Sequence, residues 1–363
     1  MVDQIQRAPA EVRYAAELIR LTEADKDPKP NGWNLSPKAV RRFILGDNAL
    51  DVKQKFFGDD PLVDRCIVSL MGHQGLMLVG EPGTAKSLLS ELLSSAISGT
   101  SKLVIQGSAG IIEDHLRYGW NYALLLAEGP SERALVASPI LTAMREGRIA
   151  RIEELTRCAP EVQDAIISLM SEKTVSIPEL GAEVESRALP GFNLIGTANL
   201  RDRGVHDMSS ALKRRFNFET VHPIADAAFE KDLIDKQVTE RMADGPISPD
   251  VNADVLDLVV SVFRDLRTGR TADGASVAVP NSVMSTAEAV NVTHAAALEA
   301  AYLDDGKVTA GHIARQIGGV VFKDDPEDAR KFRAYVDQIA KPRSRTSRTW
   351  SAFYGSAKDA LRD

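Results

Sequence analysis

The sequence predicts an α/β protein: a parallel β-sheet between helices, followed by a smaller all-α domain. Between residues 61 and 220, short apolar segments alternate with segments of helical period, which is typical of parallel strands joined by crossover helices. A glycine-rich turn joins the first apolar segment to the next helix, as in phosphate-binding loops. From residue 224 onward the period is helical, with proline and glycine breaks, which indicates a separate helical domain.

Size and composition exclude several classes of protein. A chain of 363 residues is long enough for more than one domain. Its net charge of -7 argues against a surface built for nucleic acid. The longest apolar runs are too short for a membrane span, and the first residues lack the features of a signal peptide. Cys66 and Cys158 form neither a disulfide framework nor a zinc pattern. We therefore expect a cytoplasmic protein without a membrane span.

Residues 1–48 are predicted to form an N-terminal helical extension. "PAEVRYAAELIRLTEA" has apolar residues at helical spacing, and a loop separates it from "SPKAVRRFIL". In the second segment, Ser36 suits the N-cap and Pro37 the first helical position. The α/β domain, residues 49–223, then opens with a helix over 61–74.

The strongest motif is "GLMLVGEPGTAKSLLSELL", a strand, a glycine-rich turn and a helix that ends at Gly99. Backbone N–H groups of such a turn bind phosphate, aided by the helix dipole. Lys86 is predicted to reach the β- and γ-phosphates of ATP, and the Ser87 hydroxyl to bind Mg²⁺. Ala85 replaces the expected second glycine, so we expect it to have an ordinary helical φ. An accidental strand–helix connection is the alternative. The predicted nucleotide contacts are Gly80, Glu81, Pro82, Gly83, Thr84, Ala85, Lys86, Ser87 and Leu88.

A second strand end carries two carboxylates. After a strand over 102–107 and an irregular stretch, "RIARIEE" reads as a strand that ends at Glu153 and Glu154. Phosphate-loop ATPases need one carboxylate on the metal side and another that orients the attacking water. Glu153 is predicted for the first role and Glu154 for the second, with an amphipathic helix after them. Alternatively, the strand has simply reached solvent.

Two further polar positions follow. A β-hairpin is predicted around "ELGAE", and then a buried strand, "FNLIGTA", leads into Asn199. Asn199 is predicted to position the water or to sense the γ-phosphate; capping of a turn is the alternative. A short helix, "SSALKRRF", ends in a basic cluster before the last strand, "FETVHP". Arg215 is predicted to project into the nucleotide site of a neighbouring subunit, unless the cluster is only a solvated surface.

The remaining residues are predicted to be helical. Segments 226–243, 249–267, 282–303 and 309–322 form a lid domain, residues 224–322. The C-terminal tail, residues 323–363, mixes arginines with Trp350, Phe353 and Tyr354. We favour a helix docked on a neighbouring subunit. Binding of single-stranded nucleic acid or an acidic partner is the alternative.

Together these motifs resemble the AAA+ ATPases, and within them the MoxR group. The resemblance covers residues 50–322 and rests on "GEPGTAKS", "GPSERALVASPILTAMREGRIARIEELTRCAPEVQDAIISLMSE", "PGFNLIGTANLRDRG" and "ALKRRF" in that order. It implies an α/β subdomain, a helical lid and a homo-oligomeric ring, usually a hexamer, with ATP at the subunit contacts. It also implies insertions within 108–137 and at 172–190 that face the pore or the substrate.

The resemblance implies a chaperone-like ATPase that remodels or matures a partner protein, often one with a von Willebrand factor A domain. Two departures favour an alternative, an ATP-binding scaffold with weak hydrolysis. The family's acidic pair is Asp-Glu, where this chain has Glu153 and Glu154, and Ala287 stands where the lid often has an arginine. A motor subunit of a nucleic-acid-directed defence complex is a further alternative, which the acidic charge disfavours.

Overall fold

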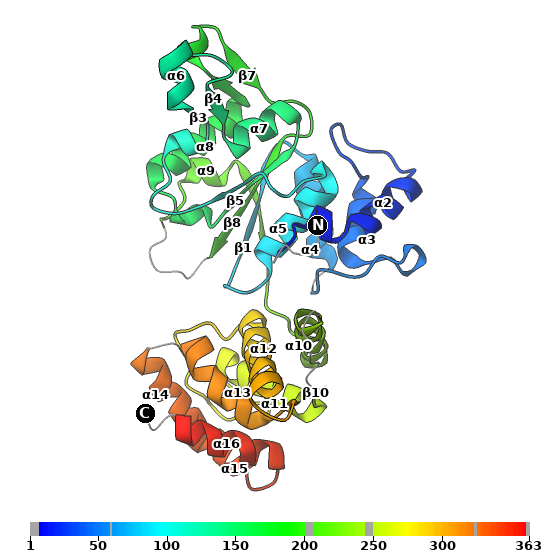
Figure 1. Ribbon diagram of the computed structural model, residues 1–363, viewed down its shortest axis with the longest axis vertical. Helices are drawn as coiled ribbons and strands as arrows, with labels where there is room; N and C mark the ends of the chain where they lie inside the picture. The colour runs from blue at the N-terminus through cyan, green and yellow to red at the C-terminus, as the bar shows by residue number, and fades with distance from the viewer. Residues whose placement is uncertain (1–6, 59, 200–205, 244–249, 323–324, 361–363) are drawn as a thin grey trace. The chain divides into compact units, whose positions relative to one another are not determined.

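The chain folds into two compact units. The computed structural model describes residues 7–58, 60–199, 206–243, 250–322 and 325–360 (Figure 1). The first unit runs to His222, apart from the loop segment Pro82–Thr84, and the second begins at Pro223. The sequence places this boundary after residue 223.

The first unit is built on a five-stranded sheet of order β2-β5-β8-β1-β9. All of its strand pairs are parallel, so the predicted fold class is confirmed. In this order the strand before the phosphate loop, β1, lies between β8 and β9. The strands are β1 (Gly75–Gly80), β2 (Val104–Gln106), β5 (Ile149–Glu153), β8 (Asn193–Asn199) and β9 (Phe216–Thr220).

Helices cover both faces of this sheet, as Figure 1 shows. Strand side chains alternate between faces, so Leu76 and Leu78 enter one apolar cluster while Met77 and Val79 enter the other. The first cluster includes α3 (Pro37–Leu45), α4 (Asp60–Met71) and α5 (Lys86–Ser98). The second includes α7 (Pro139–Glu146), α8 (Pro160–Glu172) and α9 (Ser210–Lys213).

The N-terminal helices pack on the first face of the sheet. They are α1 (Ala10–Arg13), α2 (Ala15–Ala24) and α3. Leu21 and Phe43 are buried in the same cluster as α4 and α5. The predicted N-terminal extension therefore shares the core of the α/β unit.

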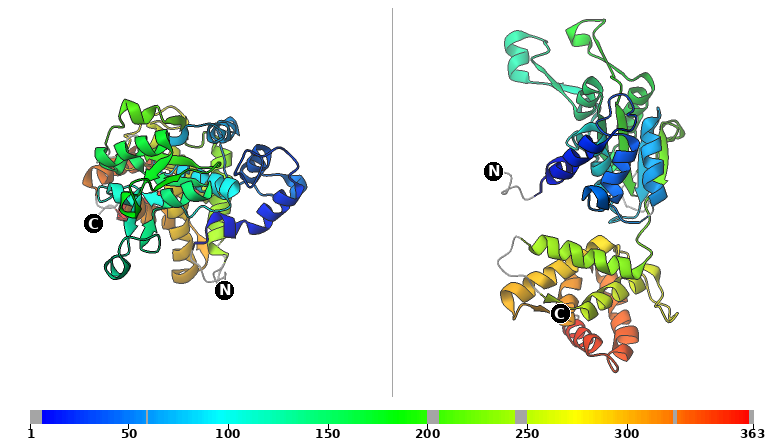
Figure 2. Two further views of the ribbon diagram at one scale, coloured as in Figure 1. Left: turned by 90° about the horizontal axis from the view of Figure 1, so that it is seen from above. Right: turned by 90° about the vertical axis from the view of Figure 1, so that its right-hand side faces the viewer.

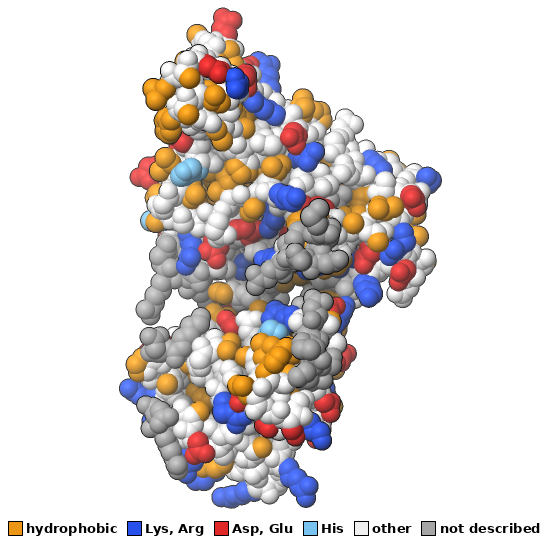
Figure 3. Space-filling model, in the orientation of Figure 1, with side chains coloured by type: hydrophobic (Ala, Val, Ile, Leu, Met, Phe, Trp, Pro, Cys, Tyr) orange, Lys and Arg blue, Asp and Glu red, His pale blue; other side chains and the backbone are white. Residues whose placement is uncertain are grey.

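Both predicted insertions have structure of their own (Figure 2). The first contains the antiparallel pair β3 (Tyr118–Trp120) and β4 (Leu135–Ala137), with α6 (Tyr122–Glu128) between them. The second is the predicted hairpin, β6 (Thr174–Ser176) with β7 (Glu185–Arg187). On α6, Tyr122 is 75% and Leu126 89% exposed, and hydrophobic side chains gather over this insertion in Figure 3. The first insertion thus presents an apolar surface.

The second unit is a helical domain with one small sheet. Its helices include α10 (Ala227–Met242), α11 (Ala253–Thr268), α12 (Thr286–Leu303) and α13 (Ala310–Ile317). A parallel pair of short strands, β10 (Asp250–Val251) and β11 (Lys307–Val308), was not predicted, because segments of two residues carry no periodicity. Among the helices of the described ranges, none combines the length and apolar character that crossing a bilayer requires.

The C-terminal segment completes the core of this second unit. It comprises α14 (Pro326–Tyr335), a π-helical stretch (Val336–Ala340), α15 (Lys341–Arg343) and α16 (Arg348–Ala360). Phe353 is fully buried in the cluster that α11, α12 and α13 share. Arg343 pairs with Asp265 at 3.0 Å, and its guanidinium carbon lies 4.8 Å from the centre of the Trp350 ring. The sequence predicts a separate tail docked on a neighbour, whereas here these groups contact their own unit.

Replacement of Phe353 by alanine tests this packing. Removing a fully buried phenylalanine side chain costs about 3–5 kcal/mol, so the thermal midpoint of the second unit should fall by about 10 °C. Tyr302→Ala in α12 is the matched control, because Tyr302 is 54% exposed. Calorimetric scans of both variants make the comparison, and equal effects would contradict the packing.

Candidate active site

The phosphate loop joins β1 to α5 as the sequence predicts. Strand β1 ends at Gly80 and α5 begins at Lys86. The Lys86 ammonium is buried against the turn, where its Nζ donates to the carbonyl oxygens of Gly80 at 3.2 Å and Glu81 at 2.7 Å. Gly83 has a φ of +76°, which favours glycine. The turn therefore places a cation at the N-terminus of α5, where the helix dipole also attracts an anion.

Ala85 corrects one detail of this prediction. We expected an ordinary helical φ, but Ala85 has φ +66° and ψ +23°, in the left-handed region. Its carbonyl oxygen accepts the first bond of α5, from the Leu89 N–H at 2.9 Å. The chain enters the helix through a turn that suits glycine, and an alanine there costs about 1 kcal/mol. Strain of this kind concentrates at functional sites.

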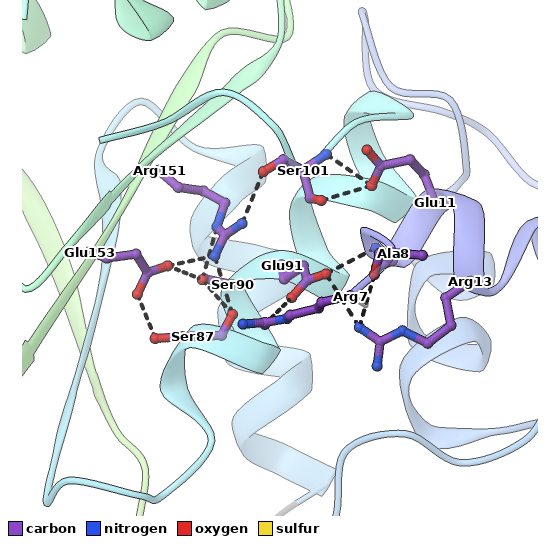
Figure 4. A network of polar contacts seen from close by, with 11 residues as sticks. Arg7, Ala8, Glu11, Arg13, Ser87, Ser90, Glu91, Ser101, Arg151 and Glu153 are labelled. Carbon is purple, nitrogen blue, oxygen red and sulfur yellow. Dashed lines mark hydrogen bonds and ion pairs between the residues drawn. The ribbon is translucent and has the colours of Figure 1, made fainter. Parts of the chain in front are cut away.

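The carboxylate of Glu153 lies in a cage of hydrogen-bond donors beside this loop (Figure 4). Its Oε2 accepts from the Ser87 hydroxyl at 2.7 Å and from the Thr197 hydroxyl at 2.8 Å. Its Oε1 accepts from the Ser90 hydroxyl at 2.7 Å and from Nη2 of Arg151 at 2.6 Å. The carboxylate thereby connects α5, β5 and β8, and the reading of Glu153 as a strand end in solvent does not hold, since its exposed fraction is 6%.

This cage keeps Glu153 ionised. Burial raises the pKa of the carboxyl, but the Arg151 guanidinium and the three hydroxyls lower it by more, so the net direction is down. Carboxylate and hydroxyl oxygens are hard ligands of the kind that Mg²⁺ prefers. Within the described ranges, no group of three or more His, Cys, Asp or Glu side chains could hold a metal ion. A metal beside Ser87 and Glu153 would therefore take its other ligands from phosphate oxygens and waters. The donor set at Ser87 and Glu153 therefore fits Mg²⁺.

The sequence predicts Ser87 and Glu153 but misses the three groups that support them. Arg151 precedes Glu153 by two residues, so both point to the same face of β5. Ser87 and Ser90 are three residues apart on α5 and share one helix face. Those two spacings were legible in the sequence. Thr197 comes from β8, and only the strand order brings it to Glu153.

Glu154 lies next to the cage, with a left-handed backbone of φ +53°. Its N–H donates to the Thr197 hydroxyl at 2.9 Å, and its carboxylate, 32% exposed, pairs with Arg157 at 3.1 Å. The neighbouring loop contacts this turn so closely that a Cβ at Gly107 would lie 2.4 Å from the carbonyl oxygen of Glu154. The backbone of Glu154 is therefore held from two sides, while its side chain has one cationic partner within reach.

Asn199 ends β8 at the same edge of the sheet. It lies opposite Gly80 in the β1–β8 register, so the phosphate loop, Glu153 and Asn199 all follow the carboxyl ends of adjacent parallel strands. Ligands bind at this edge in open α/β sheets. The part of the "GTANLRDRG" motif over 200–204 lies outside the described residues.

Arg215 lies at the opposite edge of the sheet, where the amino ends of the strands meet. It precedes β9, whose first residue pairs with Gly75 at the amino end of β1, and its carbonyl oxygen accepts the Gly75 N–H at 2.8 Å. Its Nε donates to the Ser171 hydroxyl at 2.7 Å. The length of β1, about 17 Å at about 3.3 Å per residue, separates it from the phosphate loop. The fold thus brings Lys86, Ser87, Glu153, Glu154 and Asn199 to one edge and leaves Arg215 away from them.

Comparison with known proteins identifies the family. Residues 75–216 match the AAA domain of the dynein-related subfamily, and residues 228–362 match the C-terminal domain of YehL-like AAA+ ATPases. Over 353 residues the chain is 46% identical to the uncharacterized protein YehL of Escherichia coli. The aligned region covers 97% of each chain. The chain belongs to the YehL-like AAA+ ATPases. Membership in this AAA+ family supports ATP as a ligand of the chain.

This AAA+ chain also resembles proteins at lower sequence identity. It is 27% identical to the uncharacterized protein SH1500 of Staphylococcus haemolyticus, over 60% of this chain and 78% of that protein. Among solved structures, it is similar to Brucella abortus NtrX in complex with ADP, with a TM-score of 0.48 and 13% identity. That match covers 84% of this chain and 64%, less than two thirds, of NtrX. The Thermotoga maritima RuvB branch migration motor matches with a TM-score of 0.45 and 14% identity, over 78% and 77% of the two chains.

The strain at Ala85 gives a stability prediction. Ala85→Gly should stabilise the first unit by about 1 kcal/mol, because glycine adopts a positive φ without steric cost. The thermal midpoint should rise by about 2–4 °C. Ala16→Gly, at an exposed position within α2, is the control and should have the opposite effect, since glycine is unfavourable inside a helix. A midpoint that falls in both variants would contradict a strained Ala85.

Proposed function

We propose that this YehL-like AAA+ chain is a MoxR-type ATPase. It assembles into a homo-oligomeric ring, a hexamer, and hydrolyses Mg·ATP to remodel or mature a partner protein. The observation that carries the proposal is the cage around Glu153, which holds an ionised carboxylate 2.7 Å from the Ser87 hydroxyl at the start of α5. A buried carboxylate at that point can contact the Mg²⁺ that accompanies the phosphates of a nucleoside triphosphate.

Each residue at this edge then has a chemical role. The N–H groups of the loop and Lys86 bind the phosphates, and Ser87 and Glu153 hold Mg²⁺, which supplies positive charge to the phosphate oxygens. Glu154 orients the attacking water and accepts its proton. Asn199, opposite Gly80 at the end of β8, holds that water or contacts the γ-phosphate.

The position of Arg215 supports a ring. An arginine that stabilises charge on the γ-phosphate must reach it, and Arg215 lies at the opposite edge of its own sheet. A neighbouring subunit can present its Arg215 to the nucleotide, so each site takes Glu154 from one subunit and Arg215 from the next.

The apolar surface of the first insertion supports a protein partner. Tyr122, Leu126 and Val136 are exposed there, and exposed apolar groups mark sites of protein interaction. The net charge of -7 disfavours nucleic acid. A partner that carries a von Willebrand factor A domain is the specific candidate.

One observation favours the second candidate, an ATP-binding scaffold with weak hydrolysis. The Glu154 carboxylate pairs with Arg157 at 3.1 Å, and this ion pair competes with an attacking water for the carboxylate oxygens. The two candidates differ in turnover and agree on nucleotide binding.

Measuring ATP hydrolysis per subunit against protein concentration separates them. A working ring gives a specific rate that rises with concentration, and Glu154→Gln should lower it by about 100-fold or more while ATP still binds. Glu161→Gln, an exposed position in the first turn of α8, is the control and should retain the rate. ATP binding with a negligible wild-type rate would favour the scaffold.

Mixing two inactive variants tests the shared site. Arg215→Ala and Glu154→Gln should each be inactive alone, but a mixture should regain activity, because some sites then combine an intact Glu154 with an intact Arg215 from the neighbour. Lys213→Ala, exposed at the end of the preceding helix α9, serves as the control and should be active alone. Absence of recovery in mixtures that do form oligomers would contradict a role for Arg215 between subunits.

A further inference from the structure

Arg151 is a buried arginine that the phosphate chemistry does not itself use. It lies inside the sheet on β5, with 7% of its surface exposed. A buried guanidinium is costly unless its donors are paired. Here they are paired: Nε donates to the Ser90 hydroxyl at 3.0 Å, Nη1 to the carbonyl oxygen of Ser101 at 3.0 Å, and Nη2 to Glu153 at 2.6 Å.

These contacts divide the two oxygens of Glu153 between different partners. Oε1 accepts from Arg151 and Ser90, and Oε2 accepts from Ser87 (Figure 4). Oε2 also accepts from Thr197. A charge-assisted bond from a planar guanidinium fixes the orientation of a carboxylate more strongly than a neutral donor does. Arg151 therefore fixes the plane of the Glu153 carboxylate, so that one oxygen faces Arg151 and the other faces Ser87.

The N-terminal helix completes the support of this arginine. The Ser101 carbonyl oxygen that accepts from Arg151 belongs to a residue clamped by Glu11 of α1, whose Oε2 accepts from the Ser101 N–H at 3.1 Å and hydroxyl at 2.7 Å. Helix α1 is also attached to α5, because Glu91 accepts the Ala10 N–H at 2.9 Å. A continuous path of polar contacts thus runs from Glu11 through Ser101 and Arg151 to Glu153 (Figure 4).

We propose that Arg151 is a positioning residue for the metal site: Arg151 fixes Glu153 so that its Oε2 faces Ser87 and Mg²⁺. Glu11 of the N-terminal helix in turn holds Arg151 in place through Ser101. This inference rests on the metal site of the proposed function and adds its supporting residues. Groups that orient metal ligands change metal affinity by about 10–100-fold when replaced. Among the described residues, the Glu11 carboxylate accepts from Thr100 and Ser101, which lie outside the phosphate loop, so nucleotide binding without metal should not depend on this path.

Arg151→Lys tests the proposal, because lysine keeps the positive charge and loses the planar donor set. The full chain is titrated with ADP by calorimetry at Mg²⁺ concentrations from zero, in the presence of a chelator, to saturation. We expect the Mg²⁺ concentration at half-maximal enhancement of ADP binding to rise about 10-fold. The metal-free affinity for ADP should equal that of the wild type.

Two further variants make the result decisive. Arg148→Lys is the control, since Arg148 precedes the same strand but is partly exposed and pairs with Glu146 on the surface; its Mg²⁺ dependence should match the wild type. Glu11→Gln removes no buried charge from the cage, and it should raise the Mg²⁺ midpoint in the same direction by a smaller factor. It decides the question if Arg151→Lys does not fold.

The outcomes also separate this inference from the proposed function. A wild-type chain that binds no ADP contradicts the proposed function itself. A wild type that responds to Mg²⁺, with Arg151→Lys and Glu11→Gln responding equally, overturns the role of Arg151. An equal loss of metal-free and metal-dependent binding in Arg151→Lys also overturns it, because the arginine would then support the whole fold.

Discussion

The hydrogen bonds to the Glu153 carboxylate are the interaction on which the rest of the site depends. They connect the first turn of α5 to the ends of β5 and β8, through Ser87, Arg151 and Thr197. A buried carboxylate without these donors would have a strongly raised pKa and would lose its charge. With them it stays ionised beside the phosphate loop, and the sheet edge gains a fixed negative charge where the proposed metal ion would bind.

The parallel sheet imposes the second constraint. All carboxyl ends of the strands lie at one edge, so Gly80, Glu153 and Asn199 converge there without long loops. The residues that precede the strands lie at the other edge, and Arg215 is among them. An ATPase that uses both edges needs a second subunit, so within this account the topology and the proposed ring are linked.

Much of the fold and of the candidate site could be predicted from the sequence, because the decisive signals are local. The apolar run before the glycine-rich turn, the strand that ends in Glu153 and the hairpin around Gly181 depend on neighbours in the chain. What was missed depends on distant contacts or on backbone angles. The positive φ of Ala85 comes from the shape of the turn, and the burial of Phe353 depends on helices far away in the sequence. The bond from Arg151 to the carbonyl oxygen of Ser101 likewise joins two different segments of the chain.

The most direct test of the account is the position of the metal in a complex of the full chain with ADP and Mn²⁺, located in crystals by the anomalous signal of manganese. The account predicts one strong peak at about 2.1–2.2 Å from the Ser87 hydroxyl oxygen, with Glu153 Oε2 in contact directly or through one water. The nucleotide phosphates should lie against the loop that precedes Lys86. Manganese bound away from Ser87 and Glu153, with ADP present in the loop, would contradict the claim that this carboxylate is the metal side of the site.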